Sequence, residues 1–373
     1  MDYKSELNLC LESIDPVAYE KTRNFTFGKI TKLSKFITHG VVNTNWVINY
    51  LIKNYELDIT HKLINEVAWR EYFQVVLKNF KLSIFTPFKP PLRDYQNHIP
   101  DDIILAQTGI EPIDDFINKL YAKGYLHNHE RLWLSSYMIH FRGISWILGA
   151  RWMYYYLLDG DIASNFLSWQ WVAGTLNGKP YLFNKNNIEK YSKYKLIKSS
   201  ILNHDYDYLI YQAKEKIKNI ENKELNLSQK FDAKSFIKNS DISPSKKQIN
   251  IIHPWCLGKE YKPENIGILI TEYHNKFLWS ESRLKFVETI IKSNCDIILV
   301  GDFENIKTRL KEYTIITSET FNPYYSELFE QLNANLNKTL FFTPYQMDKI
   351  ESFSKFWRKN LKKNYQNKIN LDY

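Results

Sequence analysis

The hydrophobic pattern of this chain changes once, near residue 249, and that change limits the folds open to it. Up to about Gln212, apolar residues recur every three or four positions, as in segment 64–80, which predicts packed helices. From residue 249, short apolar runs at 266–271, 296–300, 313–317 and 339–343 alternate with helical patterns at 280–293 and 324–336. Strands that alternate with helices are typical of a parallel sheet. We therefore predict an all-α region followed by a small α/β region, with a Rossmann-like parallel sheet of about four or five strands.

A stretch of different composition separates the two regions. Residues 213–248 are rich in Lys, Asn and Ser, which predicts a solvated helix followed by a linker. The predicted organisation is a helical domain over 1–212, a linker over 213–248 and an α/β domain over 249–373.

Composition narrows the classes of partner. The formal charge of +9 favours an anionic partner such as nucleic acid, although solvated lysines explain it equally well. Aromatic residues reach 16%, more than a core needs, and could serve base stacking, flavin packing or electron transfer. The three cysteines are far apart, which predicts a reducing cytoplasmic setting without a disulfide framework or a metal site. The N-terminus does not resemble a signal peptide, and no apolar stretch approaches the roughly 20 residues of a membrane span, so we expect no membrane partner.

The segment 159–171, DGDIASNFLSWQW, is the most informative part of the chain. Asp161 is a plausible N-cap, and Asn165 and Trp169 follow it on the same helical face. A carboxylate, an amide and an indole on one face could hold a polar heterocycle. The alternative is a capped core helix with buried tryptophans.

Two further segments combine polar and aromatic residues. In segment 124–131, Asn128 and Arg131 lie on one side at the entry to an apolar stretch, where they could also simply cap and solvate the helix start. In segment 66–73, Glu66, Trp69 and Arg70 share a helical face and suit a stacked, hydrogen-bonded ligand. The alternative for Glu66 and Arg70 is an ordinary surface ion pair.

A fourth segment, 30–40, offers hydroxyls and a cation at Thr31, Lys32 and Ser34, a composition that can hold a phosphate. In this order, the four segments resemble the FAD-binding domain of the DNA photolyase and cryptochrome family. The resemblance rests on the DGD-x₃-N-x₃-WQW, E-x-x-WRE and G-x-x-HN-x-x-R patterns and covers roughly residues 19–191.

The resemblance implies an FAD site. Thr31–Ser34 would bind the pyrophosphate, Arg131 and Asp159 would pair beneath the flavin ring, and Asn165 would face flavin N5. The full set of implied FAD contacts is Tyr19, Thr31, Lys32, Leu33, Ser34, Glu66, Arg70, Asn128, Arg131, Asp159, Asp161 and Asn165.

The resemblance also implies a substrate pocket and an electron-transfer path. The pocket for an everted pyrimidine dimer would be lined by Glu66, Trp69, Asn128 and Trp171. Catalytic roles would fall to Glu66 and Asn128, and Trp169 and Trp146 would carry electrons to the flavin. The outer tryptophan of the family's chain is missing, and Tyr95 could replace it.

These implied roles predict a monomeric deoxyribodipyrimidine photolyase, which uses reduced FAD and blue light to split cyclobutane pyrimidine dimers in DNA. The paired histidines of (6-4) enzymes are missing, which disfavours (6-4) repair. His129 and Leu132 replace the usual Arg and Met, which leaves open a cryptochrome-like photoreceptor without repair activity. A third alternative is a flavoprotein whose dimer pocket is blocked.

The α/β region follows the helical region, whereas in the family it normally precedes it. We expect a permuted or independently acquired domain. It could hold an antenna chromophore such as a folate or deazaflavin, or it could only pack and stabilise, which we favour because no glycine-rich nucleotide motif is present.

Overall fold

The computed structural model describes residues 2–196, 200–215, 223, 225, 227, 247–260, 262–342 and 346–368. The chain forms two compact units. We call Met1–Pro16, Thr31–Ser83 and Gln229–Tyr373 the sheet unit, and Val17–Ile30 and Ile84–Ser228 the helical unit. The predicted combination of a helical region followed by a small parallel α/β region is confirmed. The compact units do not follow the predicted domain boundaries, however, because residues 31–83 group with the sheet.

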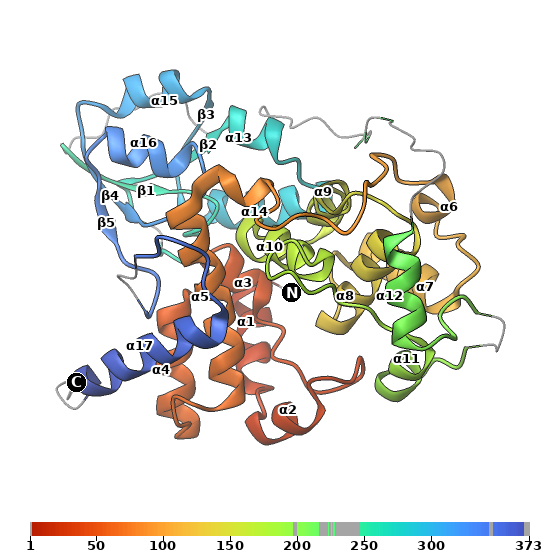
Figure 1. Cartoon of the computed structure of the whole chain (residues 1–373). Helices are drawn as coiled ribbons and strands as arrows, with labels where there is room; N and C mark the ends of the chain where they lie inside the picture. The colour runs from red at the N-terminus through yellow and green to blue at the C-terminus, as the bar shows by residue number, and fades with distance from the viewer. Residues whose placement is uncertain are drawn as a thin grey trace. The chain divides into compact units, whose positions relative to one another are not determined.

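The sheet has five parallel strands in the order β3-β2-β1-β4-β5 (Figure 1). Their bounds are β1 Gln248–Ile252, β2 Asn265–Ile270, β3 Ile297–Gly301, β4 Thr314–Ser318 and β5 Asn335–Asn337. The central strand β1 pairs Ile251 with Ile266 of β2 and Ile249 with Ile315 of β4. The predicted strand at 339–343 is wrong: residues 339–342 form no strand, and the edge strand is the short, exposed β5.

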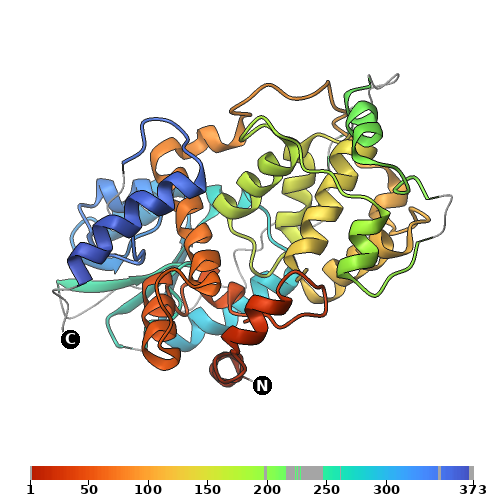
Figure 2. The same ribbon diagram turned by 60° about the horizontal axis from the view of Figure 1, so that its bottom comes forward.

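Helices cover both faces of this sheet. Their bounds are α13 Thr271–Lys276, α14 Glu281–Asn294, α15 Phe303–Leu310 and α16 Tyr325–Gln331. In Figures 1 and 2, α14 lies on one face and α15 and α16 lie on the other. Right-handed crossovers give this placement, because the connection from β2 to β3 runs in one direction along the sheet and those from β3 to β4 and from β4 to β5 run in the other. The helix predicted over 280–293 is confirmed as α14, whereas α16 ends five residues before the predicted end at 336.

The remaining helices of the sheet unit come from the two ends of the chain. They are α1 Tyr3–Glu12, α3 Ser34–Thr38, α4 Thr44–Tyr55, α5 Lys62–Phe80 and α17 Phe353–Lys368, and the 3₁₀ turn η1 Lys81–Phe85 lies at the unit boundary. Asp2 and Asn43 cap α1 and α4 by accepting backbone N–H groups. The α5 pattern predicted from segment 64–80 is confirmed.

The helical unit contains α2, α6 to α12 and the π-helical turn η2. Their bounds are α2 Pro16–Thr22, α6 Asp101–Ile104, α7 Glu111–Lys123, α8 Asn128–Ser136, η2 Tyr137–Phe141, α9 Trp146–Tyr156, α10 Ile162–Ala173, α11 Lys185–Tyr191 and α12 Tyr206–Lys214. The apolar stretch that follows Arg131 does not form one helix, because the chain turns at Gly143, whose φ is +66°, before α9 begins. Among the described residues, no helix has the length and apolar character to cross a membrane.

Candidate functional site

The start of α8 is held by a reciprocal cap. Nδ1 of His127 accepts the N–H of His129 at 3.2 Å, and the Glu130 carboxylate accepts the N–H of His127 at 2.7 Å. Lys119 lies 2.6 Å from the same carboxylate. Asn128, the first residue of α8, is exposed, so the cap fixes the backbone from which its amide projects.

A bidentate ion pair joins α8 to the segment before α10. Nη2 of Arg131 donates to both carboxylate oxygens of Asp159 at 3.0 and 2.8 Å, and Nε donates to the carbonyl of Leu126 at 2.9 Å. Burial disfavours the guanidinium charge, but Asp159 outweighs it and raises the pKa of Arg131. The predicted ion pair is therefore present, and its position beneath a flavin ring remains a proposal.

The start of α10 carries the two polar residues that the sequence placed on one face. Asp161 is the predicted N-cap: its carboxylate accepts the N–H of Ser164 at 2.7 Å and the hydroxyl of the same residue at 2.8 Å. Asn165 donates from Nδ2 to the carbonyl of Ala150 at 2.9 Å, which ties α10 to α9. Because Nδ2 is used inside the protein, the amide orientation of Asn165 is fixed.

The tryptophans of this region are mostly buried. Trp169 is 2% exposed and lies directly on Gly149 of α9, where a Cβ would come within 2.3 Å of the indole. Trp146 is 5% exposed at the start of α9. Trp171 is half-buried and lies over Tyr181, with ring centroids 5.3 Å apart. This burial fits a capped core helix as well as an electron path, so the electron-transfer roles remain predictions.

Gln170, which the sequence analysis did not single out, anchors the irregular connection before α6. It is fully buried, and its Nε2 donates to the carbonyls of Ile84 and Thr86 at 2.7 and 3.0 Å. Its Oε1 accepts the N–H of Phe88 at 3.3 Å. A glutamine between two tryptophans in an apolar helix was the available signal, since a buried amide requires hydrogen-bond partners.

In the sheet unit, the Thr31–Ser34 segment makes a tight turn into α3. Lys32 has a φ of +55°, and Leu33 has right-handed backbone angles and is 2% exposed. Successive residues of opposite backbone hand turn their N–H groups to one side, a geometry that suits anions. Binding of the FAD pyrophosphate by these residues stays a proposal.

Phe353, the first residue of α17, covers one face of Trp69. The two rings are stacked, with centroids 4.0 Å apart and planes 14° apart. The neighbouring Tyr72 ring meets Trp69 edge-on, and its hydroxyl donates to the carbonyl of Glu351 at 2.5 Å. A side chain of this chain therefore occupies an aromatic surface that the sequence analysis assigned to the pyrimidine dimer.

Glu71 fastens the chain segment that leads into α17. Its carboxylate is 0% exposed and accepts the backbone N–H groups of Phe341 and of Phe342, the latter at 2.9 Å. Burial raises the pKa of Glu71 to about 8, although the two N–H donors act in the opposite direction. Of the other α5 residues of the predicted site, Arg70 donates to the hydroxyl of Thr38 at the end of α3, and Glu66 is half-buried.

His129 lies where the resemblance expects an arginine. Burial, followed by the charges of His127 and Arg23, lowers the pKa of His129 to about 4. Its ring packs against Trp133 and Tyr191 at about equal centroid distances of 5.6 and 5.7 Å. The side chain is therefore neutral near pH 7 and supplies no cation to an anionic partner.

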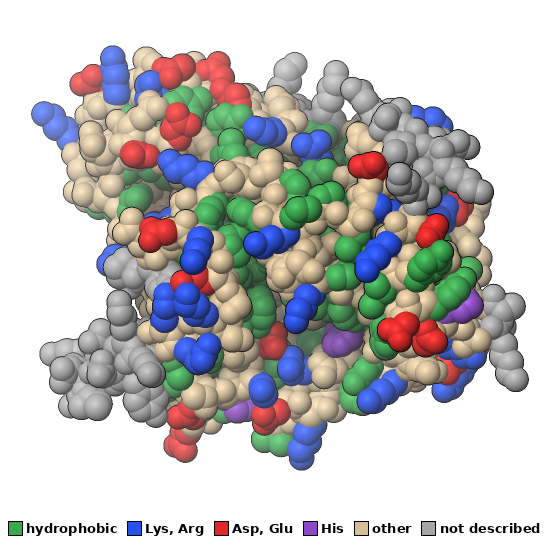
Figure 3. Space-filling view, viewed as in Figure 1, with side chains coloured by type: hydrophobic (Ala, Val, Ile, Leu, Met, Phe, Trp, Pro, Cys, Tyr) green, Lys and Arg blue, Asp and Glu red, His purple; other side chains and the backbone are tan. Residues whose placement is uncertain are grey.

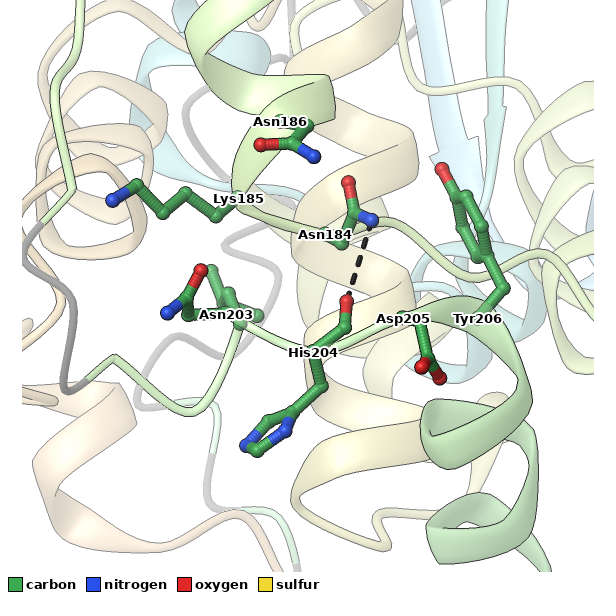
Figure 4. A pocket seen from close by; sticks show the side chains of 8 residues that line it. Asn184, Lys185, Asn186, Asn203, His204, Asp205 and Tyr206 are labelled. Atoms are coloured by element: carbon green, nitrogen blue, oxygen red, sulfur yellow. Dashed lines mark hydrogen bonds between the residues drawn. The ribbon is translucent and has the colours of Figure 1, made fainter.

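The helical unit also has two cavities away from the predicted site residues. One cavity has a volume of about 310 Å³ and is shown in Figure 4. The amide of Asn184 donates there to the carbonyl of His204 at 3.4 Å, and Lys185 extends away from Asn184. The other, of about 300 Å³, is lined by residues that include Arg93, His140 and Tyr208. Neither is lined by a predicted site residue.

A comparison with known protein families matches part of the helical unit and most of the sheet unit's α5. Residues 63–197 match the model of the FAD-binding domain of DNA photolyase. Residues 63–197 are therefore similar to that domain. The matched range contains α8, the Arg131–Asp159 pair and the start of α10, and the cofactor of such a domain is FAD.

Curated relatives include both branches of the photolyase and cryptochrome family. Cryptochrome DASH of Danio rerio is 28% identical over 51% of this chain and 36% of the relative. The chloroplastic/mitochondrial cryptochrome DASH of Oryza sativa is 31% identical over 43% of this chain and 29% of the relative. The mitochondrial deoxyribodipyrimidine photo-lyase of Saccharomyces cerevisiae is 28% identical over 41% and 30%. The aligned part thus spans about a third of the length of these relatives.

Solved structures also match part of the chain. The cryptochrome of Synechocystis sp. PCC6803 is 24% identical, with a TM-score of 0.44 over 50% of this chain and 42% of that one. A class III photolyase of Agrobacterium tumefaciens is 24% identical, with a TM-score of 0.41 over 50% and 41%.

The photolyase-like residues are divided between the two units. Tyr19, Asn128, Arg131, Asp159, Asp161 and Asn165 belong to the helical unit, and Thr31–Ser34, Glu66, Trp69 and Arg70 belong to the sheet unit. The donors of the helical unit fit FAD. No described residue accepts a hydrogen bond from Nη1 of Arg131, whose side chain is 24% exposed, so a compensated cation with unused N–H groups is available to a polar ring.

Proposed function

We propose that this protein repairs cyclobutane pyrimidine dimers in DNA with reduced FAD and blue light. The observation that supports the proposal is the Arg131–Asp159 ion pair, which joins α8 to the segment before α10 inside the range that matches the photolyase FAD-binding model. The anchored Asn165 lies on α10 in the same range. An excited reduced flavin supplies an electron that opens the cyclobutane ring and then returns.

The protein side chains have binding and orienting roles in this proposal. Arg131 and Asp159 hold the flavin ring by charge and hydrogen bonds, and Asn165 presents its amide toward N5. Thr31–Ser34 receive the pyrophosphate, and Glu66 and Asn128 hydrogen-bond the dimer. A dimer stacks poorly in the duplex, so its extrusion costs less than that of a normal base, and Trp69 and Trp171 offer it aromatic surfaces.

Two observations favour the second candidate, a cryptochrome-like flavin photoreceptor. Phe353 stacks on a face of Trp69, and His129 is neutral near pH 7. The first leaves less aromatic surface for a dimer to stack on, and the second removes a positive charge that could bind a DNA phosphate. In this candidate the same flavin domain absorbs light, and dimers are not repaired.

One assay separates these candidates. The purified protein with reduced FAD is mixed with ultraviolet-irradiated oligonucleotides and illuminated with blue light, and the remaining dimers are counted. We expect the dimers to disappear in the light and to persist in a dark control. Persistence of dimers in the light, while a separate sample of the protein with oxidised FAD undergoes photoreduction, would exclude repair and leave the photoreceptor.

A further inference from the structure

The order of the strands marks one place where a ligand would be expected in the sheet unit. The chain winds outward from β1 to β2 and β3, and then returns to build β4 and β5 on the other side. In open parallel sheets, ligands bind outside the carboxyl ends of the strands at the point where this direction reverses. Here that point lies between the ends of β1 and β4, after Ile252 and Ser318.

Side chains of the protein itself occupy this point. His253, which follows β1, is 0% exposed and donates from Nε2 to the carbonyl of Ser318 at 2.9 Å. Its Nδ1 accepts the N–H of Trp255 at 3.2 Å, so both ring nitrogens are used. The rings of Phe329 and Tyr325 lie 5.4 and 6.1 Å from the imidazole. The switch point is thus filled by a hydrogen-bonded histidine in an aromatic setting.

The loop after His253 instead forms hydrogen bonds with the segment at the end of α3. The N–H groups of Leu257 and Gly258 donate to the carbonyls of His39 and Gly40 at 3.0 and 2.8 Å. Nδ1 of His39 donates to the carbonyl of Pro254 at 2.9 Å. Gly40 has a φ of +59°, and a Cβ there would lie 2.0 Å from the carbonyl oxygen of Trp255. The two backbones therefore approach as closely as only glycine allows.

Further contacts hold His39 from the helix side. Its imidazole is 0% exposed and meets the rings of Trp279 and Phe286 at 5.7 and 5.6 Å. The residue directly before it, Thr38, accepts a hydrogen bond from Arg70 of α5. The five-residue helix α3 is thus fixed at its end by the β1 loop, by the region of α14 and by α5.

We propose that the α/β fold of this chain supports the Thr31–Ser34 segment through α3, with His39 as the positioning residue, and does not hold a second chromophore at its switch point. The proposal rests on the proposed function, which assigns the FAD pyrophosphate to Thr31–Ser34. Because α3 is only five residues long, a displacement at His39 moves the turn at Lys32 and Leu33 directly. In other open parallel sheets that bind nucleotides, the loop after the first strand contacts the nucleotide. In this chain the same loop binds the segment His39–Gly40 of the protein itself.

The test compares flavins that differ in their phosphates. His39→Phe removes the donor to Pro254 and keeps a ring among the aromatic neighbours. We expect it to lower FAD affinity about tenfold, the effect of one lost hydrogen bond, and to leave riboflavin affinity unchanged, because riboflavin lacks the pyrophosphate. His39→Gln keeps a donor and restores the FAD preference. If His39→Phe does not fold, Thr38→Val, which removes the acceptor of Arg70, is expected to lower the same preference.

Asn265→Ala is the matched control in the same unit. Asn265 is 2% exposed and donates to the carbonyls of Glu260 and Asn294 at the opposite, amino end of β2. Its loss should lower stability and preserve the FAD-to-riboflavin ratio. An unchanged ratio in folded His39→Phe, or a second chromophore bound in equal amount to FAD, would overturn the inference. Failure of the wild-type protein to bind any flavin would instead overturn the proposed function, and this inference with it.

Discussion

At the scale of single residues, the stability contributed by the Arg131–Asp159 pair depends on how far each side chain is exposed to water. Asp159 is almost buried, whereas the Arg131 side chain keeps 24% of its surface exposed. A pair of this kind contributes little net stability, but removal of one partner leaves the other charge poorly solvated. Ligand binding by this pair is part of the proposed function, and the pair is not needed as a source of folding stability.

Asp159→Asn tests that interpretation. The change keeps the shape of the side chain and removes the charge that compensates Arg131, so we expect flavin content to fall. The free energy of unfolding should drop by about 1–3 kcal/mol, below the full cost of breaking a buried pair because Arg131 is partly exposed. Flavin absorbance per protein and urea denaturation measure the two effects.

The helical unit offers a matched control in Arg142 and Asp102. Arg142 donates to both oxygens of Asp102 at 2.7 and 2.9 Å, and its side chain is also 24% exposed. Asp102→Asn should lower stability and leave the flavin content at its wild-type level. Equal loss of flavin in both variants would mean that Asp159 acts only through folding.

At the scale of helices and strands, the sequence predicted those elements whose own residues carry the signal. The strands β2, β3 and β4 and helix α14 lie within a residue or two of their predicted bounds, because each is a distinct apolar run or a distinct helical period. The edge strand β5 was missed, since its three residues are exposed and bury no apolar face. Segment 339–342 has strand-like composition, but its N–H groups at Phe341 and Phe342 bind Glu71 in place of a neighbouring strand.

Glu71 of α5 is also expected to make the free energy of unfolding depend on pH. In the unfolded chain the Glu71 carboxyl ionises near 4.5, and in the folded unit it keeps its proton up to about pH 8. The folded state therefore binds more protons between these values, and the free energy of unfolding falls as pH rises, by up to about 1.4 kcal/mol per pH unit. We expect Glu71→Gln to flatten this slope, as measured by urea denaturation across the window.

Glu304→Gln provides the control for that experiment. Glu304 lies on α15 with a side chain that is 70% exposed, and it pairs with Lys307 at the surface. Its removal should leave the slope of the wild-type protein unchanged. A Glu71→Gln protein with the full wild-type slope would show that another group causes the pH dependence.

At the scale of the whole molecule, the chemistry of the site residues was predictable and their surroundings were not. The Asp161 cap followed from a local pattern, and the Arg131–Asp159 pair followed from the resemblance of its segments to photolyases. The stack of Trp69 on Phe353 joins residues from opposite ends of the chain, and no local pattern reports such a contact. The same holds for residues 31–83, which group with the sheet because their buried faces find partners after residue 250.

Net charge is a property of the whole chain, and its role can be tested directly. The formal charge is +9, yet Lys and Arg side chains spread among acidic and apolar ones over the face shown in Figure 3. If DNA is the partner, affinity for undamaged duplex should fall between about 50 and 200 mM salt, with a logarithmic slope of about 0.9 per phosphate contacted.

The preference for irradiated over undamaged duplex should stay constant across the same titration, because eversion and stacking of a dimer release no counterions. Fluorescence anisotropy of both duplexes gives the two slopes. Salt-independent binding would mean that the lysines are merely solvated. A preference that vanished with rising salt would mean that the discrimination is electrostatic, which would remove Trp69 and Trp171 from the role of stacking surfaces.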